Sequence, residues 1–368
     1  MQEDGAAEGA RPEVGEVVPT LRPTFTLTIG SLSSGTDNPV GGPGTLVVER
    51  DMDVPADALR LRLRERADIA VGDEVSLALG HDGEEETVFT GAVEKVRPAI
   101  SDVVVRALGR THDLLTLRTS VTYVNQSAGS IARDLIGQAG LSAGTVDDGP
   151  VLPRYVVDRA LSAHSHLKGL ADRLGYELYA DRDGNIMFHP LGPASNLDAL
   201  GGTLGAVADA AGALLGSGGE SYAFGQQLLG AATGRRDVAW GTIEVGGESP
   251  MSGQGDTTEH WLTTNDADFR GSAGDGEPAL LVRDPAARTK DLADRFAAGR
   301  LAVAARTGRE VSISVLGRPQ VDLGNTITIA DVPDETVNGS GYVRALRHRF
   351  SDEAGFVTEM RISVEPES

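Results

Sequence analysis

Apolar and polar residues alternate with a period of two in several short segments of the chain. Leu59, Leu61 and Leu63 alternate with three arginines, which places the leucines on one face of a strand and the arginines on the other. The same alternation marks residues 25–29, 46–48, 75–79, 88–96 and 103–108, and Gly, Asp and Pro separate these segments. Short strands in such close succession predict a small antiparallel barrel or sandwich over residues 24–118.

Beyond residue 118 the spacing of apolar side chains changes to the helical period. The predicted elements are a helix at 130–139 before Gly140, a helix at 162–174 before Gly175, and a hairpin at 176–188 whose turn contains Gly184. Glycine suits all three places because it adopts the left-handed backbone conformation without strain. We therefore predict a small α+β domain over residues 119–190.

Strand patterns return in the last third of the chain. They cover residues 238–245, 311–315, 326–329, 342–350 and 357–364. A helix is predicted at 285–306, with Asp284 as its N-cap and Pro285 at its first position. These segments predict a second β domain over residues 222–368, with an inserted loop at 250–280 before the helix.

Two segments carry few strongly apolar side chains. Residues 1–23 hold five carboxylates and three prolines, so we predict a flexible acidic arm without a signal peptide, and hence synthesis and assembly in the cytoplasm. Residues 191–221 form an Ala/Gly-rich insert, in which seven glycines between 199 and 219 argue against a membrane-spanning helix. We expect no stable membrane insertion.

The composition excludes several functions. The chain has 54 acidic against 33 basic residues and a formal charge of −21, which repels phosphate and argues against direct binding of nucleic acid. It has no cysteine and none of the motifs typical of a nucleophile, a phosphate loop, a dinucleotide site or a zinc protease. His164 and His166 lie two positions apart on a predicted helix and so face different directions. We predict no catalytic residues, no cofactor, no metal site and no enzymatic activity.

The two predicted β domains share a sequence pattern. Residues 72–77 resemble 324–329, and residues 91–96 resemble 341–346. In each copy a Gly-Asp or Gly-Asn turn starts an alternating strand, and a second glycine follows the first by 19 or 17 residues and precedes the next strand. We interpret this pattern as an internal duplication; the alternative is that Gly-turn-strand units recur by chance in β proteins.

Further motif positions occur in order along the chain. They are Gly72, Asp73, Phe89 and Gly91 in the first β domain, Gly175 and Gly184 in the α+β domain, and Gly317, Pro319, Gly324, Gly341, Tyr342, His348 and Thr358 in the second β domain. In this order they resemble the baseplate hub proteins of contractile phage tails and phage-tail-like injection systems, which include the phage late control D proteins and the hub half of VgrG. The resemblance covers residues 24–190 and 222–365 and implies structural roles for these positions.

The resemblance implies a mainly β, α+β fold in which two tube-protein-like antiparallel β-barrels flank the small α+β domain. It implies a homotrimer that forms a pseudo-sixfold ring and adapts a hexameric inner tube to a trimeric spike. The implied partners are two further copies of the chain, the inner tube protein, a separate spike protein and other baseplate proteins. The chain ends directly after the second β domain, so we expect the spike to be a separate polypeptide of the same phage tail or phage-tail-like particle.

Two other functions stay open on the sequence. One is a hub with accessory cell-wall hydrolase activity, because some of the 54 acidic side chains must lie near one another. The other is a carbohydrate-binding β protein, which the acidic, β-rich composition suggests. We also expect that negative charge partly lines the channel of the ring and discourages the adhesion of acidic cargo.

Overall fold

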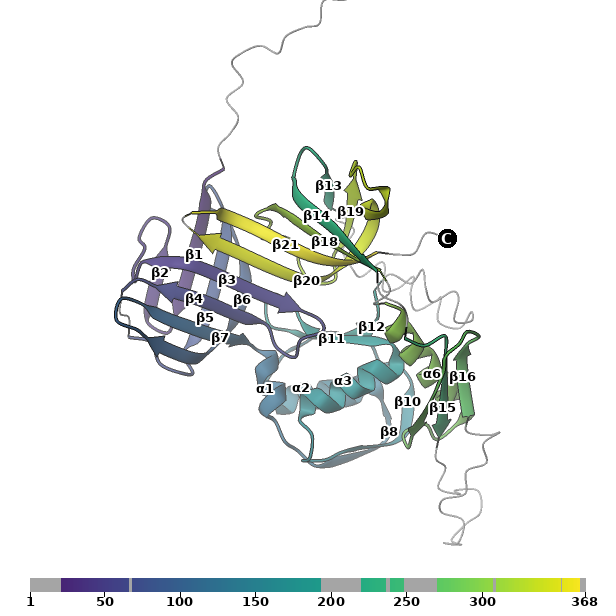
Figure 1. Ribbon diagram of the computed structural model, residues 1–368. Helices are drawn as coiled ribbons and strands as arrows, with labels where there is room; N and C mark the ends of the chain where they lie inside the picture. Colours follow the sequence, from purple (N-terminus) through teal and green to yellow (C-terminus); the bar gives the residue numbers. More distant parts are fainter. Residues whose placement is uncertain are drawn as a thin grey trace, which may run out of the picture.

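A computed structural model describes residues 21–65, 68–192, 220–235, 239–247, 270–306, 309–351 and 353–364. This part of the chain is mainly β, as predicted. Two β-rich units lie side by side, and helices with short sheets lie against one end of them (Figure 1). The predicted acidic arm up to residue 20, the predicted insert from 193 to 219 and the predicted loop from 250 to 269 lie outside the described residues.

The first unit consists of the alternating segments between residues 23 and 109. Its strands are β1 (Pro23–Ile29), β2 (Leu32–Gly35), β3 (Pro43–Asp51), β4 (Ala58–Leu63), β5 (Glu74–His81), β6 (Glu84–Pro98) and β7 (Val103–Gly109). Alternate side chains of these strands point into one apolar core, and their neighbours face outward. The three leucines of β4 are buried, as predicted, and the two arginines between them are exposed.

The second unit is built in the same way from residues near the end of the chain. It contains β13 (Glu220–Ala223), β14 (Leu228–Arg235), β18 (Arg309–Leu316), β19 (Thr326–Ala330), the 3-10 turn η5 (Glu335–Val337), β20 (Gly339–Ser351) and β21 (Gly355–Val364). Its core collects the inward side chains of these strands, among them Tyr222, Ile313 and Met360. The two units therefore have separate apolar cores.

One continuous sheet nevertheless joins the two units. Neighbouring strands follow the order β14-β18-β21-β20-β3-β4-β7-β6-β5-β1-β2, and β19 joins β20 and β13 at the side of the second unit. Strand β20 pairs with β3 over seven positions, from Ala345 opposite Asp51 to Ser351 opposite Thr45. Because β20 gives its second edge to β3, the described strands form an open path and no closed barrel, unlike the two tube-protein-like β-barrels that were predicted.

The helical patterns form the expected helices in the part of the chain that lies between the two β units in sequence. The elements are α1 (Thr111–Thr116), β8 (Val121–Ser127), α2 (Ala128–Gln138), β9 (Ala143–Val146), β10 (Val151–Val157), α3 (Ala163–Leu174), β11 (Tyr176–Ala180) and β12 (Ile186–Pro190). Ser127 and Ser162 cap α2 and α3, since each hydroxyl accepts a hydrogen bond at 3.1 Å from the N–H three residues later. Gly175 ends α3 with a positive φ of 67°.

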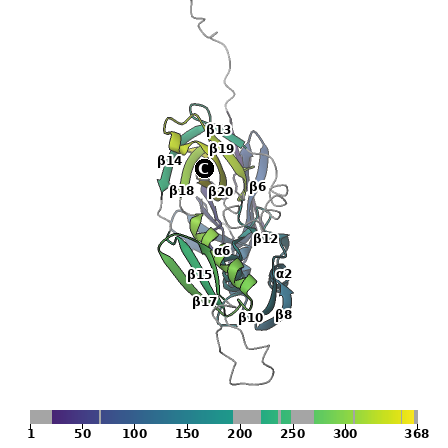
Figure 2. The same cartoon turned by 90° about the vertical axis from the view of Figure 1, so that its right-hand side faces the viewer.

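The segment between β14 and β18 packs with the α+β domain and not with the second β unit. It contains β15 (Thr242–Gly247), β16 (Arg270–Gly274), β17 (Ala279–Asp284) and α6 (Lys290–Ala305). Helix α6 packs against β15 and β16 and lies beside this sheet in Figure 2. Leu292, Phe296 and Val245 share one apolar core with the residues of α2 and α3, so the predicted placement of this helix in the second β domain differs from its packing.

The predicted start of α6 is wrong by five residues. Thr289 is the N-cap, and its Oγ1 accepts a hydrogen bond from the N–H of Leu292 at 3.2 Å. Asp284 is buried instead, where its Oδ2 accepts hydrogen bonds from Arg173 Nε at 2.6 Å and from Arg300 Nη2 at 2.8 Å. The buried carboxylate thus ties α3 to α6, a role that its place before a proline did not indicate.

We expect Gly299→Ala to destabilise the protein although alanine favours helices. A Cβ at Gly299 of α6 would lie 2.4 Å from the carbonyl oxygen of Arg173, at the point where α6 crosses the end of α3. Gly137→Ala on α2 is the matched control, because a Cβ there meets no atom within 4 Å, and it should stabilise by up to about 1 kcal/mol. Thermal unfolding of both variants checks this, and equal stabilisation by the two alanines would contradict the close helix crossing.

Candidate functional site

Five strands of the first unit recur in the second unit in the same chain order. Strands β3, β4, β5, β6 and β7 correspond to β14, β18, β19, β20 and β21. The neighbours β3·β4, β4·β7, β6·β7 and β5·β6 are all antiparallel. Their counterparts β14·β18, β18·β21, β20·β21 and β19·β20 are antiparallel as well. This shared topology supports the interpretation of the sequence pattern as an internal duplication.

The matched glycines make the same backbone hydrogen bonds in both copies. Gly72 donates its N–H to the carbonyl of Val93, and the N–H of Val93 donates to the carbonyl of Asp73, both at 2.9 Å. The second copy repeats both bonds at 2.9 Å between Gly324, Val343 and Asn325. Both glycines have a positive φ, 94° and 87°, and a bulge follows each valine. These positions therefore set the start of two equivalent hairpins.

The junction of β20 with β3 brings aromatic side chains of the second unit into the core of the first. Phe350 packs edge-to-face on Phe25 of β1, with 5.1 Å between ring centroids. Phe350 and Phe356 both belong to the core cluster of the first unit, although they lie on β20 and β21. Backbone pairing and apolar burial thus act together at this junction.

A buried arginine of β3 connects three parts of the fold. Arg50 donates from Nε to Asp57 at 3.0 Å, from Nη1 to Asp322 at 2.5 Å, and from Nη2 to the carbonyl of Ala180 at 2.9 Å. Burial raises the pKa of Asp57, and Arg50 opposes that rise. Burial also favours a higher pKa for Asp322, but Arg50 and Arg182 outweigh it and hold that pKa below its ordinary value. We refer to Arg50, Asp57 and Asp322 as the Arg50 cluster.

A second buried arginine lies on β20. Arg344 donates from Nη1 to Glu177 of β11 at 2.9 Å and from Nη2 to Asp53 at 2.8 Å. Asp53 follows β3 and also binds Arg306 at 2.8 Å and Arg361 at 3.0 Å. Burial favours a higher pKa for Asp53, but the three guanidinium groups hold that pKa below its ordinary value. We refer to these five residues as the Arg344 cluster, which joins both β units to the α+β domain.

Our sequence analysis missed both clusters, although the alternation contains a signal for them. Arg50 follows Leu46 and Val48 with a period of two, so it falls on the core face of β3. Arg344 lies in the same way between Tyr342 and Leu346. A charged residue at a core position of an alternating strand requires a buried partner of opposite charge. Such a residue in the sequence therefore indicates a buried ion pair.

Two of the predicted motif residues lie opposite each other at the junction. His348 of β20 and Thr358 of β21 are register partners, with 3.0 Å between His348 Nδ1 and Thr358 Oγ1. The N–H of Arg318 also donates to Thr358 Oγ1, at 2.8 Å. Burial lowers the pKa of His348 to about 3, so the imidazole is neutral at physiological pH. Both side chains are enclosed in the fold, where they hold the loop after β18.

The other predicted motif positions are spread over turns and close contacts and do not form one cluster. Four of the glycines have a positive φ, namely Gly72, Gly175, Gly184 and Gly324, and Gly91 and Gly317 leave no room for a Cβ. Phe89 and Pro319 are buried, and Gly341 pairs with Ile327 in the sheet. Asp73 accepts a hydrogen bond from the N–H of Ala70, and Tyr342 donates a hydrogen bond to Glu177. A Cβ at Gly317 would lie 2.0 Å from the ring of Phe356. Their placement is consistent with structural roles.

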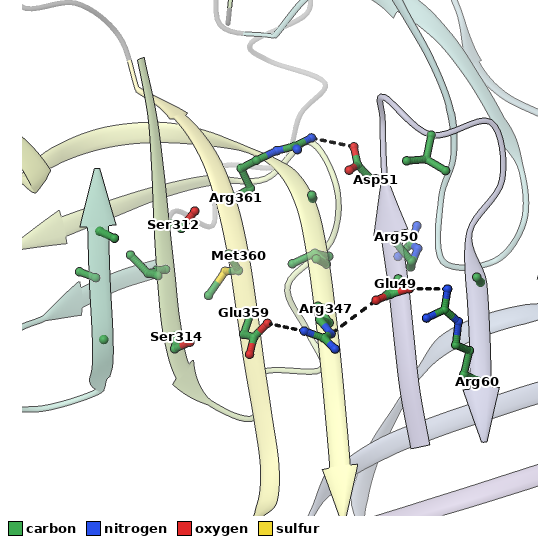
Figure 3. Close-up of a pocket in the computed structure, with 18 of the residues that line it drawn as sticks. Glu49, Arg50, Asp51, Arg60, Ser312, Ser314, Arg347, Glu359, Met360 and Arg361 are labelled. Carbon is green, nitrogen blue, oxygen red and sulfur yellow. Dashed lines mark hydrogen bonds and ion pairs between the residues drawn. The ribbon is translucent and has the colours of Figure 1, made fainter. Parts of the chain in front are cut away.

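The outward face of the shared sheet carries rows of paired charges. We refer to the outward side chains of β14, β18, β21, β20, β3, β4, β7 and the end of β6 as the polar face. Glu359, Arg347 and Glu49 are successive register partners, and Arg347 lies 3.3 Å from Glu359 and 3.5 Å from Glu49 (Figure 3). Arg60 of β4 extends the row, 3.7 Å from Glu49. The row crosses from one unit to the other, so it continues the backbone junction at the surface.

A hollow of about 610 Å³ opens on the polar face. Small residues line part of it, among them Gly230, Ala232, Ser312, Ser314 and Ala345. Arg361 of β21 reaches over Ala345 of β20 and binds Asp51 of β3 at 2.8 Å (Figure 3). A small residue on the middle strand thus permits an ion pair between two strands that are not neighbours.

Basic residues are concentrated on the polar face although the chain is acidic. Eight basic side chains lie there: Arg60, Arg62, Lys95, Arg97, Arg106, Arg347, Arg349 and Arg361. Six acidic side chains accompany them: Glu49, Asp51, Glu94, Asp102, Glu310 and Glu359. The excess of carboxylates in the chain therefore lies elsewhere.

The described residues contain no group of three or more His, Asp or Glu side chains that could hold a metal ion. None of the helices in the described ranges is long and apolar enough to cross a membrane. His164 and His166 start α3, and burial lowers the pKa of His164 to about 4.

Removing the buried carboxylate of the Arg344 cluster should destabilise the fold. Glu177→Gln takes away one of the two charge partners of the buried Arg344 and leaves Asp53 as the other, so the free energy of unfolding should fall by about 2 to 4 kcal/mol. Glu359→Gln removes an exposed partner of Arg347 and should cost less than about 1 kcal/mol. Urea unfolding followed by circular dichroism measures both, and equal losses would contradict a special role of the buried cluster.

The neutral His348 should make stability depend on pH. In the unfolded chain histidine takes up a proton near pH 6.5, whereas the folded protein resists protonation down to about pH 3. The contribution of His348 to the free energy of unfolding is therefore fully present above pH 6.5 and is lost as the pH decreases. When the pH falls from 7 to 5, the free energy of unfolding of His348→Gln should decrease by about 2 kcal/mol less than that of the wild type. Thermal unfolding across this range, with His112→Gln as control, checks the difference; identical slopes would refute it.

Comparison with solved structures gives matches over nearly the whole chain. A 43 kDa tail protein of prophage MuSo2 from Shewanella oneidensis has a TM-score of 0.66 and 16% identity, and the match covers 92% of this chain and 98% of that one. A tail protein from Neisseria meningitidis has a TM-score of 0.68 and 11% identity, with 94% and 97% covered. An E. coli component of the type VI secretion system, described as similar to the T4 bacteriophage tail proteins gp27 and gp5, has a TM-score of 0.57 and 11% identity, with 93% and 77% covered.

The sequence alone gives no such match, because no protein-family model and no curated protein matches it significantly. The identities to the solved structures are low, so the likeness concerns the fold. The chain has the fold of phage tail proteins and of the type VI secretion component that resembles them, which confirms the resemblance seen in the order of the motifs.

Proposed function

We propose that the chain is a structural baseplate hub of a contractile, phage-tail-like particle, in which three copies form a pseudo-sixfold ring between the hexameric inner tube and a separate trimeric spike. The observation that carries the proposal is the duplicated sheet, in which the counterparts of the two strands at the internal junction each have an unpaired edge among the described strands. The fold shared with tail proteins supports it. Both buried clusters bind their carboxylates to arginines, which supports a structural rather than an enzymatic role.

Two unpaired edges of the described strands correspond to the two strands of the internal junction. In the chain, β20 of the second copy pairs with β3 of the first copy. The counterpart of β20 is β6, whose residues 95–98 pair with β7 on one side and with no described strand on the other. The counterpart of β3 is β14, which among the described strands pairs with β18 alone. The same junction can therefore form between β6 of one chain and β14 of the next.

Such an interface is heterologous, since two different edges meet. A heterologous interface forms a closed ring when its rotation closes and an open filament when it does not. Two equivalent units per chain give six similar junctions in a ring of three chains, three within chains and three between them. A covalent duplication thus fits a partner with six subunits on one side and a partner with three on the other.

We assign the polar face to the channel of this ring. The shared sheet is the element that continues across the junctions, and each apolar core lies on its opposite side. Eight basic and six acidic side chains on the polar face do not support our expectation of a negatively charged lining. The remaining carboxylates of the chain would face the exterior and other baseplate proteins.

Introduced cysteines should cross-link the ring, because the natural chain has none. By the duplication, Arg97 corresponds to Arg347 and Gly234 to Glu49, which are register partners at the internal junction. The double variant Arg97→Cys/Gly234→Cys should therefore form covalent dimers and trimers on mild oxidation. A Cβ is tolerated at Gly234, where the nearest atom lies at 3.9 Å.

The control pairs Arg97→Cys with Gly137→Cys on α2, which lies outside both edges. It should give no cross-linked ladder. Native mass measurement of the wild type should give three chains. A stable monomer at all concentrations that also binds neither tube nor spike protein would refute the proposed function.

A further inference from the structure

The tip of the hairpin between β6 and β7 exposes an isoleucine completely. Ile100 lies seven residues after Val93, and Phe350 lies seven residues after Val343, the matched valine of the second copy. Ile100 is fully exposed to solvent, whereas Phe350 is only 7% exposed. The two side chains lie at the same distance from the matched valine and differ strongly in burial, and Ile100 lies in the turn whereas Phe350 is still paired within its strand.

The burial of Phe350 comes from the neighbouring unit and not from its own. Strand β20 carries this ring across the junction to β3, where it packs against Phe25 of β1. Phe25 is buried in that contact, and it lies opposite Leu79 of β5. The first unit therefore contains a receiving site for an apolar side chain near the end of the adjacent unit's hairpin.

The second unit has an exposed apolar patch in the corresponding place. Strand β13 lies beside β19 as β1 lies beside β5, although in the parallel direction. Tyr222 of β13 is buried, but Phe224 just beyond its end is 55% exposed. A short turn leads to Leu229, which is 58% exposed, and Leu316 at the end of β18 is 42% exposed. We refer to Phe224, Leu229 and Leu316 as the end patch.

We infer that Ile100 of one copy docks on the end patch of a second copy, through the junction of β6 with β14. This inference rests on the proposed function, because it specifies how the chains of the ring meet. This docking explains the exposure of Ile100 and of the end patch in the same way. Each lacks a partner within its own chain because its partner belongs to the next chain. Exposed aliphatic and aromatic side chains that complete each other in this way are typical of interface anchors.

The charges at the two edges are complementary as well. Arg97 faces outward near the free edge of β6, and no ion pair holds it within the described residues. Opposite it the junction places Gly234 of the next chain, and Glu310 of β18 lies directly beside that glycine. Arg97 can reach Glu310 over Gly234 in the way that Arg361 reaches Asp51 over Ala345 at 2.8 Å. A small residue on the middle strand, Ala345 or Gly234, is what both pairs require.

The isoleucine contact matters because the backbone pairing between chains is short. The internal junction has seven residue pairs, but β6 ends at Pro98, which cannot donate a backbone hydrogen bond. Fewer strand hydrogen bonds leave a larger share of the association to side chains. The loss of one buried isoleucine should then weaken association by about 10- to 100-fold.

The test compares the self-association of Ile100→Ser, Phe224→Ser and the wild type by sedimentation equilibrium. Each serine variant should shift the trimer toward monomer by about 10- to 100-fold in concentration, and the double variant should lose little more, because both changes break one contact. Ile100→Phe, which introduces the residue type of Phe350, should retain the trimer. Because Ile100 is fully exposed in the single chain, monomeric Ile100→Ser should keep the circular dichroism spectrum and the melting temperature of the monomeric wild type.

Val124→Ser is the matched control. Val124 is 59% exposed on β8 of the α+β domain, away from both edges, and its loss should leave the trimer intact. A trimeric wild type with an equally trimeric Ile100→Ser variant overturns the docking of Ile100 and leaves the proposed hub in place. A wild type that is monomeric at every concentration overturns the docking, and it overturns the hub as well if it binds neither tube nor spike protein.

Discussion

Two buried guanidinium groups determine how the parts of this fold sit together. Arg50 and Arg344 lie at core positions of β3 and β20, and their carboxylate partners come from other elements. A buried charge without a partner is very unfavourable, so an arrangement that separates these groups is excluded even where it would preserve both apolar cores. Replacement of such pairs by apolar residues can be neutral for stability, and their effect here is to select one geometry among many. The backbone junction between β20 and β3 depends on that selection.

The two copies of the duplicated hairpin show how one position acquires two functions. Glu94 and Arg344 both follow the matched valine and lie at the bulge. In the first copy Glu94 is exposed and lies 3.3 Å from Arg106 on the surface. In the second copy Arg344 points inward and joins β20 to the α+β domain. The same backbone irregularity thus directs a side chain to the surface in one unit and to the interior in the other.

Much of the fold could be predicted from the sequence because the signals are local. The alternation of β4, the serine caps and terminal glycine of α3, and the matched turns at Gly72 and Gly324 each depend on residues close together in the chain. The pairing of β20 with β3 leaves no such signal, since backbone hydrogen bonds are independent of side-chain identity. The packing of α6 was missed for a related reason. Its partner α3 lies more than 100 residues away, and the close approach of Gly299 to Gly175 is a tertiary property.

The candidate site was predicted less completely than the fold. The motif residues were located, but His348 and Thr358 proved to be partners only in the register of β20 and β21. The arginines of both clusters were visible as exceptions to an alternating pattern, and only the folded chain shows which carboxylates satisfy them. Sequence patterns of this kind indicate which residue needs a buried partner, whereas the identity of the partner depends on segments that meet only in the folded chain.

One excursion of the chain leaves and re-enters the shared sheet at neighbouring strand ends. Arg235 at the end of β14 and Arg309 at the start of β18 are register partners, so the ends of the long excursion between them are held together by the sheet itself. Extra residues inserted between these two positions can lengthen the excursion without altering the path of the strands, as long as β15 and α6 keep their place in the core that they share with α3. The position is thus a natural point for modular evolution, at which the scaffold can accept new domains while its sheet stays unchanged.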